Sequence, residues 1–155
     1  MICGEAEWEK LVKSNPYVGF MQSVMWAEFK QLLGWKTKIL GIFDGTRLIG
    51  GASVMQFPFS KKKDFLYIPE GPVLPYDHAD TEEMFHLLVS RIDTIAHLKG
   101  SALTTHLRID PRLPQIPSCL TLFQKAPFNM EPKNTRMIPL KASEETFHRE
   151  RSRCP

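Results

Sequence analysis

Two residues near the N-terminus, Trp26 and Lys30, have the types and the spacing to bind an anionic ligand. Side chains four positions apart lie on the same face of a helix. The lysine ammonium could hold a phosphate or a carboxylate there, while the indole ring packs against the rest of the ligand. The alternative is a lysine stem that only lies over a half-buried tryptophan. Spacing alone favours this packing role and leaves the binding role open.

A second feature is the turn at Gly71 and Pro72, which follows the apolar segment 65–69. Pro72 lacks an amide hydrogen, and glycine can adopt a positive φ that other residues avoid. In α/β proteins, sites often lie where a buried strand ends. We therefore expect Gly71 to adopt a positive φ and to line a substrate site, which makes Gly71→Val more harmful than Glu70→Ala. The simpler interpretation is that Gly-Pro only ends the strand.

The sequence contains no motif for covalent, metal or redox chemistry. It lacks a GxSxG elbow, a Walker-type phosphate loop and a Cys–His signature. Its five histidines do not have the spacing of metal ligands. We therefore expect no metal site, and the catalytic residues remain unknown.

Composition indicates one ordinary globular domain. The 155 residues are 43% hydrophobic and 24% charged, and the net charge of +3 is too small to indicate nucleic-acid binding by itself. Three cysteines without a CxxC pair are typical of a reducing compartment. The sequence has no evident signal peptide and no apolar run of about 20 residues. We expect a cytoplasmic protein that at most touches a membrane surface.

Hydrophobic periodicity and turn residues predict the elements that must position these residues. We expect helices over residues 5–13 and 24–33, the second capped by Ser23, ended by Gly34 and carrying an apolar stripe of Met25, Phe29, Leu32 and Leu33. Strands follow over 35–43 and 47–57, joined by a type I′ turn at Asp44-Gly45, and over 65–68.

The residue pattern in the second half of the chain predicts a crossover in which a helix connects two parallel strands. A capping box formed by Asp80 and Glu83 starts a helix that Gly100 ends, and a strand follows over 102–110. A short helix over 117–126 and a strand over 136–140 complete the order. This order is that of an α/β fold with a mixed sheet (α+β), and it is compatible with the GNAT type of acyltransferase. We expect one domain over residues 1–142 and an aberrant or truncated tail over 143–155.

Four segments in this order resemble the Fem-type (FemABX) aminoacyltransferases, which build the interpeptide bridges of peptidoglycan. They are Phe20-Met21-Gln22-Ser23-x-x-Trp26-x-x-Phe29-Lys30-x-x-x-Gly34-Trp35, the hairpin of residues 40–51, the segment of residues 67–74 with its Gly-Pro turn, and Leu107-Arg108-Ile109-Asp110-Pro111.

The resemblance implies a family fold of two tandem GNAT-like domains. It also implies transfer of an amino acid from aminoacyl-tRNA to an amine of a lipid-linked or nucleotide-linked muramyl peptide. No metal or redox cofactor is implied, since catalysis needs positioning and stabilisation of an oxyanion. By resemblance, Lys30 helps to bind the phosphates of the precursor. Contact with the inner membrane surface follows if the precursor is lipid-linked.

The sequence departs from the family pattern in two places. Glu70 stands where the family usually has an arginine before the Gly-Pro turn, and the helix begun at Ser143 leads into a tail without an apolar stripe. We therefore expect a truncated N-terminal GNAT-like domain that is inactive alone, with a poorly ordered segment over 147–155. The alternatives are a free-standing GNAT-like N-acyltransferase, disfavoured by the lack of a Gly-rich pyrophosphate loop, and a non-catalytic precursor-binding module.

Overall fold

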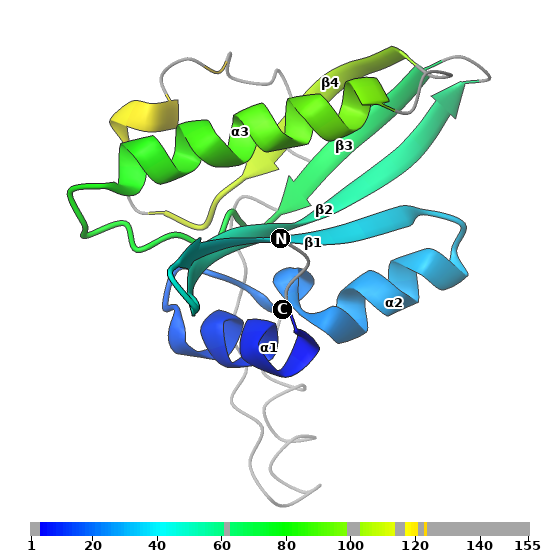
Figure 1. Ribbon diagram of the computed structural model, residues 1–155. Coiled ribbons are helices and arrows are strands. Elements are labelled where there is room, and N and C mark those ends of the chain that lie inside the picture. Colours follow the sequence, from blue (N-terminus) through cyan, green and yellow to red (C-terminus); the bar gives the residue numbers. More distant parts are fainter. Residues whose placement is uncertain (1–3, 61–62, 99–102, 114–116, 121–122, 124–155) are drawn as a thin grey trace, which may run out of the picture. The chain divides into compact units, whose positions relative to one another are not determined.

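The computed structural model describes residues 4–60, 63–98, 103–113, 117–120 and 123. Its elements follow the chain in the order shown in Figure 1. They are α1 (Glu5–Ser14), the 3-10 turn η1 (Phe20–Gln22), α2 (Val24–Leu32), β1 (Lys36–Asp44), β2 (Arg47–Ser60), β3 (Lys63–Pro69), α3 (Thr81–Leu98), β4 (Leu103–Asp110) and the 3-10 turn η2 (Ser118–Leu120).

The four strands form one mixed sheet in the order β1-β2-β3-β4. β1 pairs with β2, and β2 with β3, in antiparallel fashion, whereas β3 and β4 are parallel. Parallel neighbours need a crossover, and α3 supplies it. The predicted mixed α/β class, the hairpin and the strand–helix–strand crossover are therefore confirmed.

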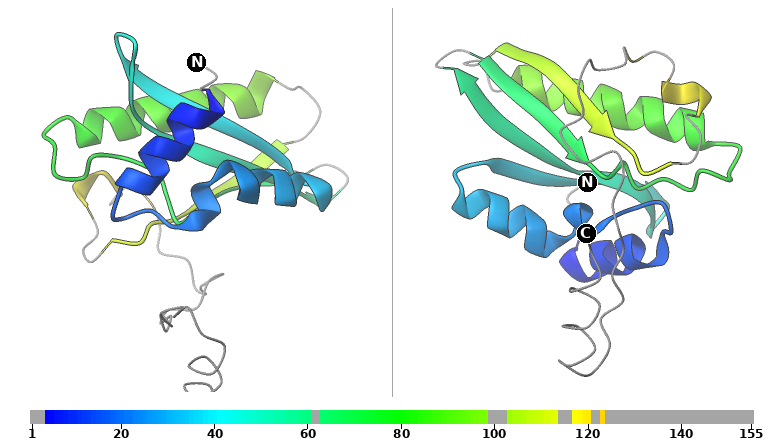
Figure 2. Two further views of the ribbon diagram at one scale, coloured as in Figure 1. Left: turned by 90° about the horizontal axis from the view of Figure 1, so that it is seen from below. Right: turned by 180° about the vertical axis from the view of Figure 1, so that it is seen from behind.

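Helices lie on both faces of the sheet. α3 covers one face, while α1 and α2 lie on the other (Figures 1 and 2). The predicted alternation of β1 explains how this edge strand serves both layers. Ile39 and Phe43 pack toward Trp8 of α1, whereas Leu40 and Ile42 join the core under α3.

The larger core lies between the sheet and α3. Its buried side chains come from β1, β2, β3, the segment after β3, α3 and η2: Ile42, Ala52, Val54, Leu66, Ile68, Leu74, Met84, Phe85, Leu88, Ile92, Cys119 and Leu120. A smaller core lies on the other face around Trp8, Val12 and Val73. Val73 reaches it because the chain after β3 returns to β2, where Val73 and Gly51 exchange two backbone hydrogen bonds of 2.9 and 2.8 Å. The Gly50-Gly51 pair thus admits a neighbouring backbone, and the β1–β2 register shifts close by, between Ile42 and Phe43.

Three local expectations need correction. The hairpin loop is Gly45-Thr46, and only Gly45 has a positive φ (56°), so the turn is not type I′, which needs two such residues. At the start of α3, the Asp80 carboxylate lies 3.4 Å from His78 Nδ1 instead of completing a capping box. The apolar stripe of α2 faces solvent: Leu32 is 86% exposed and Met25 74%, while Ala27 is the buried residue of that helix.

Some expectations lie outside the described residues. Of the helix predicted over 117–126, the structure describes η2 and Phe123. The strand over 136–140, the domain boundary at 142 and the tail 143–155 fall in the part that is not described. None of the described helices is both long and apolar enough to cross a membrane.

Candidate functional site

The position of Lys30 depends on how α2 begins. Ser23 is its N-cap: the Ser23 hydroxyl accepts a 3.2 Å hydrogen bond from the Trp26 amide, as the sequence predicts. One turn further along, Trp26 and Lys30 lie on the same side of the helix, because they are four residues apart.

The Lys30 ammonium contacts two indole rings. Its Nζ is 4.7 Å from the centroid of Trp26 and 4.8 Å from that of Trp35, with Phe29 further away at 5.9 Å. These distances are those of cation–π interactions. The charged group itself, and not only the stem, therefore contacts the rings. Spacing predicted the pairing with Trp26 but gave no sign of the second ring.

Other aromatic rings hold the two indoles. Phe20 and Phe29 pack against Trp26 with ring centroids 5.0 and 5.2 Å away, and Phe57 of β2 packs against Trp35 at 4.6 Å. Phe20, Phe29 and Phe57 are partly exposed. The result is an aromatic surface with one cation at its centre. Among the described residues, no carboxylate forms an ion pair with Lys30, which keeps its positive charge available to a ligand.

The expected conformation of Gly71 is wrong. The positive φ in this turn belongs to Glu70 (48°), and the peptide bond between Gly71 and Pro72 is cis. Gly71 is required here for a different reason. A Cβ atom at this position would lie 2.7 Å from Cδ of Gln22, closer than such atoms can approach. Gly71 thus lies against Gln22, the residue before the α2 cap, and no described contact joins it to Trp26 or Lys30.

Gln22 is the residue that the sequence reasoning missed. Its side chain is fully buried and joins two strands that separate at this point. The Gln22 carbonyl oxygen accepts from Ser53 N at 2.8 Å, and its amide nitrogen donates to Pro69 O at 2.5 Å and to Ser53 O at 3.4 Å. Trp8 Nε1 donates to the backbone oxygen of Gln22 at 2.7 Å. The available signal was a glutamine directly before a helix cap in an otherwise apolar setting.

Glu70 is bound inside the protein rather than directed at a ligand. Its carboxylate accepts a 3.2 Å hydrogen bond from Met21 N and forms an ion pair with Arg112, Oε1 to Nη1 at 3.4 Å. The negative charge of Glu70, which stands where the family usually has an arginine, is therefore paired with an arginine that lies 42 positions later. Nearby, Asp110 accepts hydrogen bonds from the Tyr67 hydroxyl at 3.0 Å and from Arg108 Nε at 3.1 Å. The bond from Tyr67 joins the parallel strands β3 and β4, whereas Arg108 and Asp110 both belong to β4.

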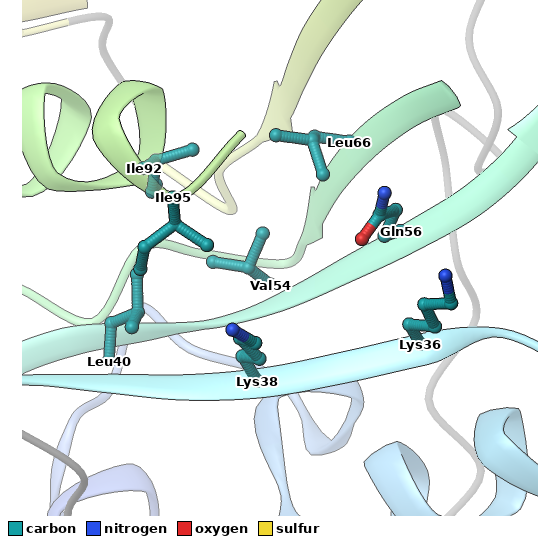
Figure 3. Close-up of a pocket in the computed structure, with 8 residues that line it drawn as sticks. All are labelled: Lys36, Lys38, Leu40, Val54, Gln56, Leu66, Ile92 and Ile95. Carbon is teal, nitrogen blue, oxygen red and sulfur yellow. The ribbon is translucent and has the colours of Figure 1, made fainter. Parts of the chain in front are cut away.

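A cavity of about 40 Å³ opens on the face of the sheet that carries α3 (Figure 3). Leu40, Val54, Leu66, Ile92 and Ile95 form its apolar wall, and Lys36, Lys38 and Gln56 are its polar groups. It has room for a few water molecules, and none of the residues that line it carries a carboxylate, a hydroxyl or a thiol group. In the part of the chain that the structure describes, no group of three His, Cys, Asp or Glu side chains could hold a metal ion.

Comparison with known proteins agrees with the fold and with the family resemblance. The chain matches the model of the FemAB family over residues 4–135. Its structure is similar to that of FemX, with a TM-score of 0.60 and 26% sequence identity, over 72% of this chain and 26% of the FemX chain. A Trypanosoma brucei acetyltransferase superposes with a TM-score of 0.47 and 19% identity, over 90% of this chain and 97% of that one. No curated protein matches the sequence significantly.

The chain thus spans about a quarter of the length of FemX. The family match, by contrast, extends over most of the sequence and includes both the aromatic surface around Lys30 and the turn at Gly71. The chain therefore belongs to the FemAB family.

Proposed function

We propose that this chain is the precursor-binding part of a peptidoglycan-bridge aminoacyltransferase, and that Lys30 contacts a phosphate of the muramyl peptide precursor. The observation that carries this proposal is the Lys30 ammonium, which contacts both Trp26 and Trp35 and has no carboxylate partner in the part of the chain that the structure describes. An ammonium held in this way is a suitable partner for a phosphate oxygen. Membership of the FemAB family supports this choice of substrate class.

The chemistry of such a transfer needs no protein nucleophile. The acceptor amine attacks the aminoacyl ester carbonyl, an amide bond forms, the ester C–O bond breaks, and the ribose hydroxyl of the tRNA leaves. The protein then has to hold the two substrates together and to stabilise the oxyanion. This requirement agrees with a site made of a cation, aromatic rings and rigid turns.

The proposal takes residues 1–142 as one GNAT-like domain that binds the precursor, residues 143–155 as a tail, and the cytoplasm as the location. Transfer would need further structure to hold the aminoacyl-tRNA, since this chain spans about a quarter of FemX. Gly71 contributes through the turn that it shapes against Gln22, and Trp26 contributes by contact with the Lys30 ammonium.

The test is a titration of a nucleotide-linked muramyl pentapeptide into the wild-type chain, Lys30→Ala and Lys38→Ala. Lys38 is a matched control, because it is an exposed lysine on the other face of the sheet. We expect Lys30→Ala to weaken binding by about fivefold, equivalent to about 1 kcal/mol for one charge contact at a wet surface. Lys38→Ala should leave binding within about twofold of wild type. Equal affinity of Lys30→Ala and wild type would remove Lys30 from the site.

A second assay with charged tRNA separates binding from catalysis. We expect no aminoacyl transfer by this chain alone, because misplacement of the reacting groups by about 1 Å costs on the order of 100-fold in rate. Clear turnover would contradict the proposal that this chain binds the precursor but needs further structure for transfer. Precursor binding without turnover, also after addition of the remaining part of a FemAB protein, would favour a non-catalytic precursor-binding module.

A further inference from the structure

Trp35 is brought to Lys30 by the way in which α2 ends. Gly34 has a φ of 85°, and its amide donates to Gln31 O at 2.9 Å, while the Trp35 amide donates to Lys30 O at 3.0 Å. These two hydrogen bonds form the Schellman motif, which commonly brings the side chains at the positions of Trp35 and Lys30 into contact. In most helices this contact joins two apolar side chains. Here it joins an indole ring to an ammonium group.

The Trp35 ring also packs against the sheet. Phe57 of β2 lies 4.6 Å from it, with the ring planes inclined by 41°. The Trp26 ring contacts the same ammonium at nearly the same distance as Trp35 does. The position of Lys30 Nζ is therefore determined jointly by a helix residue, a helix-end residue and, through Phe57, the sheet.

Contact with rings differs from an ion pair in its consequence for binding. A carboxylate would neutralise the ammonium, whereas a ring face attracts the cation and leaves its net charge unchanged. A free lysine has a flexible stem with several rotatable bonds, and its ordering opposes ligand binding. An ammonium that is already held in place binds an anion with a smaller loss of freedom.

We propose that Trp35 is a positioning residue, which together with Trp26 holds the Lys30 ammonium ready for a phosphate group. This inference rests on the proposed role of Lys30 and adds the residue that makes the lysine effective. The relevant ligand chemistry is a pyrophosphate, which nucleotide-linked and lipid-linked muramyl peptides share.

The experiment follows the Lys30 side chain directly by NMR in the intact chain. The ¹H and ¹³C signals of its ε-methylene group are assigned with Lys30→Arg, and they are compared in wild type, Trp35→Phe, Trp35→Leu and the control Leu32→Ala. Leu32 is the most exposed apolar residue of α2. Ring currents should shift the Lys30 signals upfield in wild type, in Leu32→Ala and partly in Trp35→Phe. In Trp35→Leu the shift should fall to what Trp26 and the more distant Phe29 produce.

The same samples are then titrated with inorganic pyrophosphate. We expect Trp35→Leu to bind it about three- to tenfold more weakly than wild type, which is the range expected for the loss of one cation–π contact. Trp35→Phe should recover most of the affinity. Gly34→Ala gives an independent variant, since it alters the backbone at the helix end and leaves both rings in the sequence. It should reduce both the Lys30 shift and the affinity.

The outcomes distinguish this inference from the proposed function. If the Lys30 signals of wild type and folded Trp35→Leu coincide, Trp35 does not position the lysine and the inference is overturned. If the shift depends on Trp35 but pyrophosphate leaves the Lys30 signals unchanged, Trp35 positions Lys30 and the phosphate-binding role fails. Backbone amide spectra establish that each variant is folded, and recovery by Trp35→Phe separates the ring contact from a general loss of packing.

Discussion

The Gln22 side chain lies so close to the backbone of Gly71 that a Cβ atom on Gly71 would come within 2.7 Å of Gln22 Cδ. The two residues are far apart in the sequence and meet where β2 and β3 separate. Gln22 supplies hydrogen bonds to Ser53 and Pro69 in the gap between these strands. Gly71 is thus the residue that leaves room for a polar connection between the sheet and the start of α2.

Substitution of Gly71 should therefore act through a clash. We expect Gly71→Ala to lower the free energy of unfolding by about 1–3 kcal/mol, as overpacking of a buried site does, and Gly71→Val to lower it further. Chemical denaturation measures the loss. Gly4→Ala introduces no clash, because a Cβ atom there would be 3.7 Å from its nearest neighbour, so its loss measures only the replacement of an N-cap glycine. If the clash is the cause, Gly71→Ala must cost less in a Gln22→Ala background, and additive losses would refute it.

Replacement of Gln22 by leucine should be among the most damaging single changes. Leucine is similar in size but leaves Ser53 N and the oxygens of Ser53 and Pro69 without their partner in a fully buried place. A buried polar group left unpaired costs about 1–3 kcal/mol, so we expect a total loss of about 3 kcal/mol or more. Gln31→Leu is the matched control: this exposed glutamine hydrogen-bonds to Thr37 Oγ1, and its replacement should cost about 0.5 kcal/mol or less. Similar losses for the two variants would contradict the bridging role.

Glu70 offers a test that separates a hydrogen bond from an ion pair. Glu70→Gln keeps an acceptor for Met21 N and loses the charge opposite the half-exposed Arg112, so it should cost about 0–1 kcal/mol. Glu70→Ala loses both contacts and should cost about 1 kcal/mol more. Thermal unfolding of the two variants and of Arg112→Ala measures how much the hydrogen bond and the ion pair each contribute to stability. A loss in Arg112→Ala as large as that in Glu70→Ala would mean that the ion pair is the main contribution.

The stability of a Gly34 variant should depend on whether the new residue tolerates a positive φ, and not on the volume of its side chain. Its φ is 85°, and a Cβ atom added there would have nothing within 4 Å. We expect Gly34→Ala to destabilise the chain by about 1 kcal/mol and Gly34→Asn by less, because asparagine tolerates the left-handed conformation better. Denaturation midpoints of the two variants measure this difference. An equal loss for Ala and Asn would show that the backbone at the end of α2 is not responsible.

The Cys119 thiol should make stability depend on pH in the alkaline range. Burial raises the pKa of Cys119, and the charge of Glu82 adds to this effect. The folded state therefore keeps the thiol proton when the unfolded state begins to lose it near pH ~8.5, so the free energy of unfolding should fall as the pH rises above that value. Measurement below pH ~10 avoids Tyr76, whose pKa burial also raises. Cys119→Ala should have a flatter profile between these limits, and parallel profiles would exclude the thiol as the cause.

Much of this molecule is determined by local patterns in the sequence. Alternation along residues 36–43, the Ser23 cap, Gly34 at a helix end and the apolar periodicity of α3 all predict the observed elements, because each depends on neighbours within a few positions. The pairing of Trp26 with Lys30 belongs to the same class, since one helical turn places them together. The mixed sheet followed from the order of these elements and the need for a crossover between parallel strands.

The tertiary structure decided the relationships between distant residues. Glu70 carries the positive φ that the sequence assigned to Gly71, and its carboxylate is held by Met21 N and Arg112. The conformational freedom of glycine suggested the wrong reason for Gly71, because only folding brings Gln22 against it. In the same way, periodicity predicted an apolar stripe on α2 but not which face of the helix is buried. The buried residue is Ala27, which lies outside that stripe. Local sequence fixes backbone preference and spacing, whereas the partner of a buried polar group depends on how distant segments pack.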